Sequence, residues 1–277
     1  MTRRFDVIRR HGGLLIGGLI LLIVLAIALF ADWVAPAGPW NMASAPLQPP
    51  SLNDLLGTDN LGRDIAAGVA HGARTSMLIS LVSSVASLVI GITVGAPAGY
   101  FGGVADRFLM QVSELFQTIP GFIFAITLVA IFEPSIWAIV IAIVAVSWAP
   151  VARIVRAEVL SLRTREYVQA SRLAGHADFS ILCRDIIPNT LPVVVTYTAI
   201  LMANAILLES SMSFLGLSDP NLMSWGYMVG ASRSIVRLAW WAAVFPGLAI
   251  FLTILAINLI AAGLRQHLDP KRTRSLS

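Results

Sequence analysis

The residue types that carry out catalysis are scarce in this sequence and do not fall at catalytic spacings. A phosphate-binding P-loop needs a lysine after its glycine-rich turn, whereas Lys271, the only lysine, follows Asp269 and Pro270. The four histidines form no H-E-x-x-H pair, no G-x-S-x-G elbow occurs, and Cys183 is the only cysteine. These observations predict a chain that is not an enzyme and binds no metal or cofactor itself, although they leave an unusual membrane enzyme open.

A few polar residues interrupt long apolar runs. Polar groups within a membrane span usually face the bundle interior or a wet cavity, because exposing them to lipid is costly. They therefore mark candidate positions along a translocation path. The alternative is that each one bonds to a neighbouring helix and contributes about 0.6 to 2 kcal/mol to packing. These candidates are Glu114, Gln117, Asn204 and Asn258.

Composition places the chain in a membrane. Of 277 residues, 57% are apolar and only 12% are charged, and the mean hydropathy is +0.81, which excludes an ordinary soluble enzyme. A helical span needs about 20 apolar residues. The sequence predicts an all-α membrane protein with six transmembrane helices, near residues 13–32, 75–100, 110–132, 135–152, 190–208 and 240–264.

Arginine placement predicts the orientation. If the N-terminus is inside, the inner segments hold fifteen of the nineteen Lys and Arg residues, and the outer segments hold Arg63, Arg74, Arg233 and Arg237. Because Lys and Arg stay cytoplasmic in short loops, both termini are expected inside. A chain with five or seven spans, one run lying flat, is the alternative.

Two connecting segments are longer than simple links. The outer one, 31–74, begins with several prolines and is expected to be extended. The inner one, 153–188, has the composition of a helix, a break at Gly175 and a second helix, with Asp178 placed to cap the second. A third segment, 209–237, is assigned to the outside. A polar helical hairpin inside the cell is either a docking element or a solvated linker.

The inner segment carries a recognisable pattern. It runs from Glu166 to Gly175 and ends with Ile186-Ile187-Pro188-Asn189, which resembles the EAA loop of ABC importer permeases. Gln169, Ala170 and Ser171 occupy the E-A-A places, and the Gly175 to Pro188 spacing fits without a gap. Gln169 replaces the usual glutamate, and whether Glu166 substitutes for it stays open.

Four further stretches point to one branch of that family. They are 56–64, the Ala98-Gly-Tyr-Phe-Gly-Gly103 run, 213–217 with Ser224-Trp-Gly226, and Leu268-Asp-Pro270. In this order they resemble the C-type permease subunit of dipeptide, oligopeptide and nickel importers, over roughly residues 14–271. The resemblance implies a type I importer permease in the bacterial cytoplasmic membrane, without catalytic activity, that forms half of a pathway for di- or oligopeptides. Nickel chelates, glutathione or opine-like solutes are the alternative substrates.

The resemblance also implies partners and roles. The partners are a B-type permease, two cytoplasmic ATPases that bind the ATP and Mg²⁺, and an external binding protein; no nucleic acid is implied. The residues expected to couple to the ATPases are Glu166, Gln169, Ala170, Ser171, Gly175, His176, Ala177, Asp178 and Pro188. Those expected to face the binding protein are Asp59, Arg63, Asp64, Phe214 and Trp225.

Alternatives remain for these assignments. Asp59, Arg63 and Asp64 can instead form an internal ion-pair and capping cluster, and Phe214 and Trp225 can be packing residues. The expected organisation is 1–74 for the tail, first helix and outer loop, 75–271 for the core permease domain, and 272–277 for the inner tail. A homodimeric pore, or a signalling subunit with the same fold, also stays open.

Overall fold

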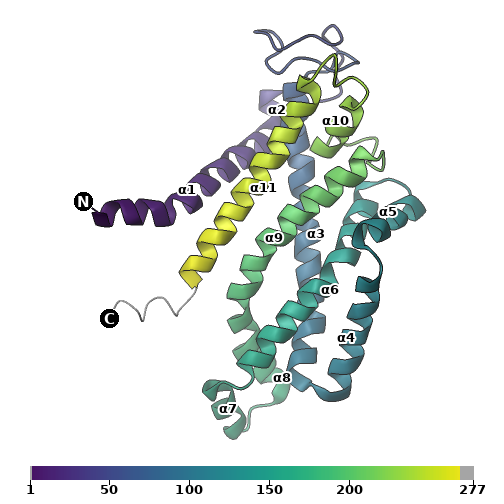
Figure 1. Cartoon of the computed structure of the whole chain (residues 1–277). Coiled ribbons are helices and arrows are strands. Elements are labelled where there is room, and N and C mark those ends of the chain that lie inside the picture. The colour runs from purple at the N-terminus through teal and green to yellow at the C-terminus, as the bar shows by residue number, and fades with distance from the viewer. Residues whose placement is uncertain (1, 269–277) are drawn as a thin grey trace.

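The computed structural model describes residues 2–268, and most of them lie in helices (Figure 1). The expected inner tail 272–277 and the Asp269-Pro270 pair lie outside the described residues. The elements are α1 (Thr2–Leu29), α2 (Ala31–Val34), α3 (Ile65–Phe101), α4 (Gly103–Thr118), α5 (Gly121–Phe132), α6 (Ile136–Leu162), α7 (Glu166–Leu173), α8 (Asp178–Ile181), the π-helix η1 (Leu182–Ile186), α9 (Ile187–Phe214), α10 (Trp225–Ser232) and α11 (Trp241–Leu268).

Five helical runs are long and apolar enough to cross a membrane, and the bent pair α4–α5 makes six if it counts as one span. The third expected span, 110–132, is therefore not one straight helix, since α4 and α5 meet at 83°. Ile119, just before Pro120, is extended with ψ 131°. Proline has no amide hydrogen and disfavours helical conformation in the residue before it, which explains the break.

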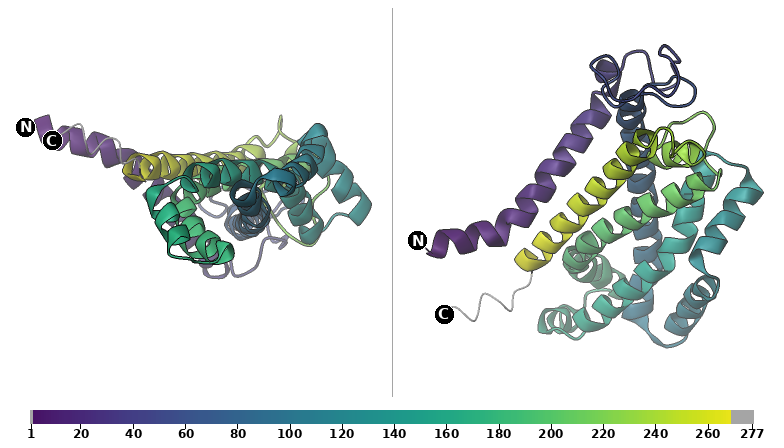
Figure 2. Two further views of the ribbon diagram at one scale, coloured as in Figure 1. Left: turned by 90° about the horizontal axis from the view of Figure 1, so that it is seen from below. Right: turned by 45° about the horizontal axis from the view of Figure 1, so that its top comes forward.

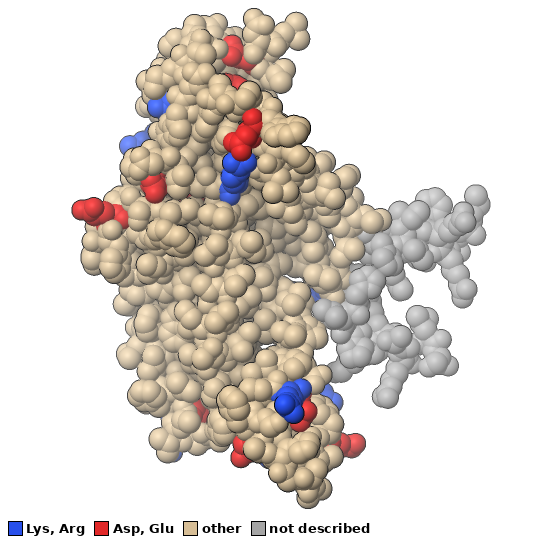
Figure 3. Space-filling view, turned by 180° about the vertical axis from the view of Figure 1, so that it is seen from behind, with Lys and Arg blue, Asp and Glu red and all other residues tan. Residues whose placement is uncertain are grey.

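Successive long passes run in alternate directions (Figure 1). Consequently, three parts of the chain point away from the outer loop that joins α2 to α3: the start of α1, the α7–α8 hairpin and the end of α11. On the face drawn in Figure 3, acidic and basic side chains gather toward the two ends, with a broad uncharged band between them. This arrangement suits a hydrocarbon layer flanked by water.

Small residues permit close helix packing. The most extensive contact between helices is that of α3 with α6, and a Cβ atom added at Gly99 would lie 2.8 Å from the Arg156 carbonyl oxygen. Helices α1 and α11 run side by side (Figure 2), and a Cβ atom at Gly17 would lie 2.7 Å from the Ala256 carbonyl oxygen. Such close approach of two helix backbones at glycine residues is typical of membrane helix interfaces.

Helix α3 begins ten residues before the expected span, at Ile65. The Asp64 side chain caps it by accepting a hydrogen bond from the Ala66 amide at 2.8 Å. Within this outer part of α3, the Arg74 guanidinium donates to the carbonyl oxygens of Ala28 and Leu29 at the end of α1. Arg74 also pairs with Asp32 at 3.0 Å and thereby lowers the pKa of that carboxyl group.

Candidate functional site

The cytoplasmic hairpin forms as the composition predicts, with a tight turn between two helices. Gly175 has φ +81°, a left-handed conformation that favours glycine, and its amide donates to the Arg172 carbonyl at 2.9 Å. The next amide, of His176, donates to the Ser171 carbonyl at 3.2 Å. Helix α7 thus ends in a Schellman-type turn that reverses the chain.

The tip of the hairpin exposes large apolar side chains. Leu173 is 90% exposed and Phe179 is 72% exposed, while Val168 and Ile181 at the base are buried. This tip lies on the side of the molecule that the topology assigns to the cytoplasm, so lipid does not cover it. Exposed apolar groups next to a polar rim mark a surface for a protein partner.

The predicted coupling residues lie along this hairpin. Gly175, His176 and Ala177 form the exposed turn, and Pro188 lies in the first turn of α9. Glu166 lies in the first turn of α7, and Gln169 donates from its amide to the Arg163 carbonyl at 3.3 Å. Ala170 and Ser171 follow on the same helix. Partial burial raises the pKa of Tyr167 beside them.

Asp178 does not play the capping role that the sequence suggested. It is the first residue of α8, whose N-cap is Ala177, and no side chain caps this helix. Its Oδ1 instead accepts a hydrogen bond from the Tyr100 hydroxyl at 2.6 Å. The Arg172 guanidinium lies 5.2 Å from the centre of the Tyr100 ring. Tyr100 therefore ties the hairpin to the inner end of α3.

Two further contacts fix the bundle near the hairpin. Arg163, just after α6, donates to the Gly99 carbonyl at 3.1 Å. Arg156 makes a bidentate pair with Asp106, with its Nε and Nη2 atoms 2.5 and 2.6 Å from the carboxylate oxygens. Sequence reasoning missed Tyr100 and these pairs as site residues, although the Ala98–Gly103 motif contains Tyr100.

An open groove runs between α6 and α9 and has a volume of about 370 Å³. Its lining mixes apolar residues with polar groups, and Asn204 in it is exposed although it lies within a span. Exposed polar groups at this depth need water or a protein partner. The lining comprises Val146, Ser147, Pro150, Tyr197, Leu201, Asn204, Leu207, Leu208 and Ser211.

The other three path candidates do not line this groove. Gln117 donates to the Ser113 carbonyl of its own helix, and Asn258 likewise donates to the Ile254 carbonyl. Glu114 is exposed on α4. The structure thus brings Asn204 together with Ser147 and Tyr197 across two helices, but leaves Glu114, Gln117 and Asn258 elsewhere.

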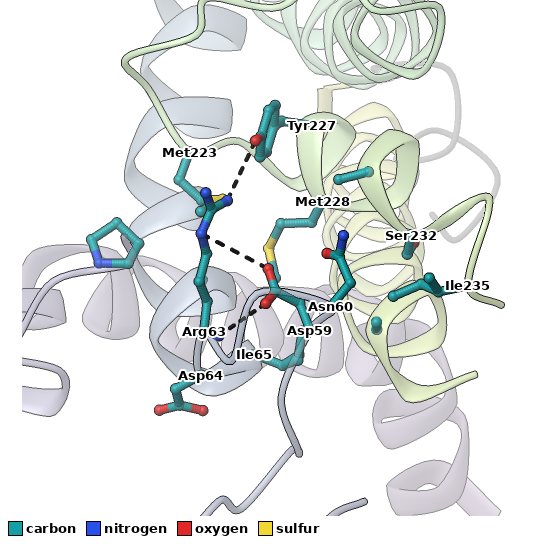
Figure 4. A pocket seen from close by; sticks show the side chains of 14 residues that line it. Asp59, Asn60, Arg63, Asp64, Ile65, Met223, Tyr227, Met228, Ser232 and Ile235 are labelled. Carbon is teal, nitrogen blue, oxygen red and sulfur yellow. Dashed lines mark hydrogen bonds and ion pairs between the residues drawn. The ribbon is translucent and has the colours of Figure 1, made fainter. Parts of the chain in front are cut away.

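The outer loop holds a small pocket around Arg63 (Figure 4). The Asp59 carboxylate accepts hydrogen bonds from the Leu61 and Arg63 amides, and the Arg63 side chain stacks 4.7 Å from the Trp40 ring centre. Arg63 also donates to the Tyr227 hydroxyl at 3.4 Å. Together with the Asp64 cap, these contacts match the internal cluster rather than a free docking surface.

The two aromatic candidates differ in exposure. Phe214, the last residue of α9, is partly exposed, whereas Trp225 is only 1% exposed. Trp225 was expected to face an external partner, and its burial overturns that expectation in this structure. Its indole N–H donates to the Val69 carbonyl at 2.9 Å, so it anchors α10 on α3.

Comparison with known proteins gives a consistent picture. The family described as "Binding-protein-dependent transport system inner membrane component" matches residues 87–274. A putative peptide transport system permease protein of Brucella abortus is 41% identical over 266 residues, covering 95% of this chain and 89% of that protein.

Two other relatives have more specific names. The di/tripeptide transport system permease protein DppC of Pseudomonas aeruginosa is 39% identical and covers 94% of this chain and 88% of its own length. The glutathione transport system permease protein GsiD of Pectobacterium atrosepticum is 37% identical, with 97% and 89% coverage.

The fold also occurs among solved structures. An inward-facing MetNI methionine ABC transporter chain superposes with a TM-score of 0.56 at 18% identity, over 71% of this chain and 95% of that one. At that identity the likeness concerns the fold alone, a type I ABC importer permease.

Proposed function

The chain belongs to the family of binding-protein-dependent transport system inner membrane components, and on that premise we propose that it forms half of an import pathway for di- or oligopeptides. The observation that carries the proposal is one continuous helical run from Asp178 to Phe214. Its inner end is the exposed hairpin and its middle lines the α6–α9 groove. A docking surface and a pathway surface therefore share one helix.

The open groove supports the proposal that this chain forms only half of the translocation pathway. Asn204, Ser147 and Tyr197 line a surface that is open on one side. A second permease subunit packed against it would close a polar conduit and cover the exposed Asn204. We propose a B-type permease as that subunit. The groove side chains would bind peptide weakly through hydroxyl and amide groups, which suits passage of varied sequences.

The hairpin is the proposed docking site for the ATPases. Leu173 and Phe179 would enter an apolar recess of the ATPase, with Gly175, His176 and Ala177 at the apex. ATP and Mg²⁺ would bind to those partners, and this chain would contribute no catalytic group. Glu166, Gln169, Ala170, Ser171, Asp178 and Pro188 would position the two hairpin helices on the ATPase surface.

The outer segments are proposed to face the binding protein through their exposed parts. Phe214 at the end of α9 is one such residue, whereas Asp59, Arg63 and Asp64 would shape the loop from within. Substrate selection would rest largely with that external protein. Glutathione is the second candidate substrate, favoured by the GsiD relative, and nickel chelates or opine-like solutes are less supported.

The test is ATP-driven uptake by the full complex. The chain is reconstituted into proteoliposomes with its partner permease, both ATPases and the binding protein, and uptake of labelled dipeptides, longer peptides and glutathione is compared. We expect peptide uptake that needs both ATP and the binding protein. Uptake of another solute class, without peptide uptake, would contradict the peptide assignment. Turnover of a substrate by the purified chain alone would support an enzyme instead.

A further inference from the structure

A carboxyl group is buried near the outer end of α9, just beyond the span 190–208 that the sequence predicts. Glu209 is only 1% exposed. Its Oε1 accepts hydrogen bonds from the Ser213 hydroxyl at 2.8 Å and the Ser224 hydroxyl at 2.6 Å, and Ser210 donates to Oε2 at 3.4 Å. Separating a buried carboxyl group from its donors is costly, so these contacts hold the surrounding elements together.

The Ser224 contact joins two elements. Ser224 is the N-cap of α10, and its oxygen accepts the Tyr227 amide hydrogen at 3.1 Å while its hydroxyl hydrogen goes to Glu209. The neighbouring Trp225 amide donates to the Ser76 hydroxyl of α3 at 3.2 Å. The short helix α10 is thus bonded to α9 on one side and to α3 on the other.

The backbones of α10 and α9 are also in direct contact. A Cβ atom added at Gly226 would lie 2.6 Å from the Ser210 Cα atom and 3.2 Å from Glu209 Oε1. The two helices can approach this closely because position 226 has no side chain. Closely packed elements of this kind move as one body instead of deforming smoothly.

The other end of the same helical run is the hairpin. From Asp178 to Phe214 the chain is helical for 37 residues, with a π-helical turn at Leu182–Ile186. At 1.5 Å per residue this run is roughly 55 Å long. A displacement of the hairpin is therefore carried along α9 to the position of Glu209.

We propose that Glu209 is a positioning residue for transport, which fastens α10 to α9 through Ser224 so that movement of the hairpin reaches the outer segment. Through the same contact, a movement of the outer segment would be transmitted back along α9 to the hairpin and the ATPases. The inference rests on the proposed function for the identity of the two partners. The proposal adds a specific link between the two regions of this chain where the ATPases and the binding protein would dock.

The first experiment measures how strongly loaded binding protein stimulates ATP hydrolysis by the reconstituted complex. In Glu209→Leu we expect stimulation to fall at least about fivefold while basal hydrolysis stays within about twofold. Glu209→Gln keeps an oxygen that accepts both hydroxyl hydrogens, so it should retain most stimulation. Ser232→Ala is the matched control, because the hydroxyl of this buried serine of α10 donates to the Val229 carbonyl within its own helix.

The results with these variants distinguish a positioning role of Glu209 from a role only in the stability of the fold. Unchanged stimulation in an intact Glu209→Leu complex overturns the proposal, and so does an equal loss in the Gln and Leu variants. If Glu209→Leu does not assemble, Ser224→Ala is compared with Ser232→Ala. A larger loss of stimulation in Ser224→Ala supports the link, and equal values overturn it.

A second measurement needs no transported substrate. In a Cys183→Ser background, spin labels replace two exposed residues, Arg233 after α10 and Trp137 at the start of α6. We expect ATP to change the distance between them in the parent complex and in Ser232→Ala, but not in Glu209→Leu. A retained change in Glu209→Leu overturns the link. If the parent complex imports no peptide, the proposed substrate fails while this measurement still decides the role of Glu209.

Discussion

The two ends of the α8–α9 helical run are held in opposite ways. At the inner end the apolar side chain of Phe179 is exposed, as is that of Leu173 on α7 across the turn, and the Tyr100 hydroxyl bonds to Asp178 in a partly buried site. At the outer end Glu209 and Trp225 are enclosed and satisfied within the chain. The inner end presents apolar side chains on its surface, whereas the outer end encloses its polar and aromatic groups within the chain.

This difference determines what a substitution should do at each end. A change at the hairpin tip should alter association with the ATPases and leave the fold intact, because few contacts within the chain are lost. A change in the outer contacts should alter how the parts of this chain move together. Matched substitutions at the two ends test this difference.

The largest effect is expected from Gly175→Arg at the hairpin turn. Gly175 has φ +81° with nothing within 4 Å of an added Cβ atom, so the cost is backbone strain of about 1 to 2 kcal/mol and a bulky charged group at the apex. We expect normal membrane insertion and a loss of uptake of about tenfold or more, measured in proteoliposomes alongside ATPase pull-down.

Gly216→Arg is the control for that variant at the outer end. Gly216 has φ +87° and equally open surroundings, so the backbone strain is the same. ATPase pull-down should stay normal in Gly216→Arg. Normal pull-down together with normal uptake in Gly175→Arg would contradict the docking role of the hairpin.

The next largest effect is expected from Phe179→Ser. Because Phe179 is mostly exposed, the thermal stability of the chain should not change, but loss of an apolar anchor should weaken ATPase binding by about tenfold or more. Binding is measured with the purified ATPase subunits. Leu52→Ser removes a similarly exposed side chain from the outer loop and should leave that binding unchanged. Equal ATPase affinity in the two variants would remove the distinction between the ends.

Much of this organisation could be predicted from sequence, because it depends on local signals. Apolar runs, arginine placement and the turn at Gly175 predicted the helices, the orientation and the hairpin. The break at Ile119–Pro120 was missed, since apolar residues continue on both sides of it. Glu209 was assigned to the outer loop because a carboxyl residue ends the apolar run.

The site contacts were less accessible to sequence reasoning. The Asp178 partner, Tyr100, comes from a segment far away in the chain, and the Glu209 partner Ser224 lies 15 residues further on, beyond a loop. Hydropathy carries no information on such pairing. Tyr100 and Asp178 are 78 residues apart, and Trp225 and Val69 are 156 residues apart. Motif spacing singled out Asp178 and Trp225 as candidates but gave no information on which atoms they contact.

An intermediate effect is expected from Tyr100→Phe. The substitution removes the hydroxyl that bonds to Asp178 but keeps the aromatic ring beside Arg172. One hydrogen bond is worth about 1 kcal/mol, so uptake should fall about two- to fivefold. Tyr227→Phe removes a hydroxyl from the weaker 3.4 Å contact with Arg63 at the outer end and should have less effect. A larger loss in Tyr227→Phe would reverse the ranking of the two anchors.

The smallest effect is expected from Asp32→Asn, which removes the exposed outer pair with Arg74. Arg74 lowers the pKa of Asp32 from its ordinary value of 3.8, so the pair stabilises the fold above pH 3.8 and this contribution is lost as the pH falls through the lowered pKa. We expect the Tm of Asp32→Asn at pH 7 to be lower by no more than about 2 °C, and the difference to vanish at low pH. Because Arg74 also donates to the carbonyl oxygens of Ala28 and Leu29, α1 should stay capped in the variant. A Tm difference that persists unchanged at low pH would assign the effect to lost packing and not to the ion pair.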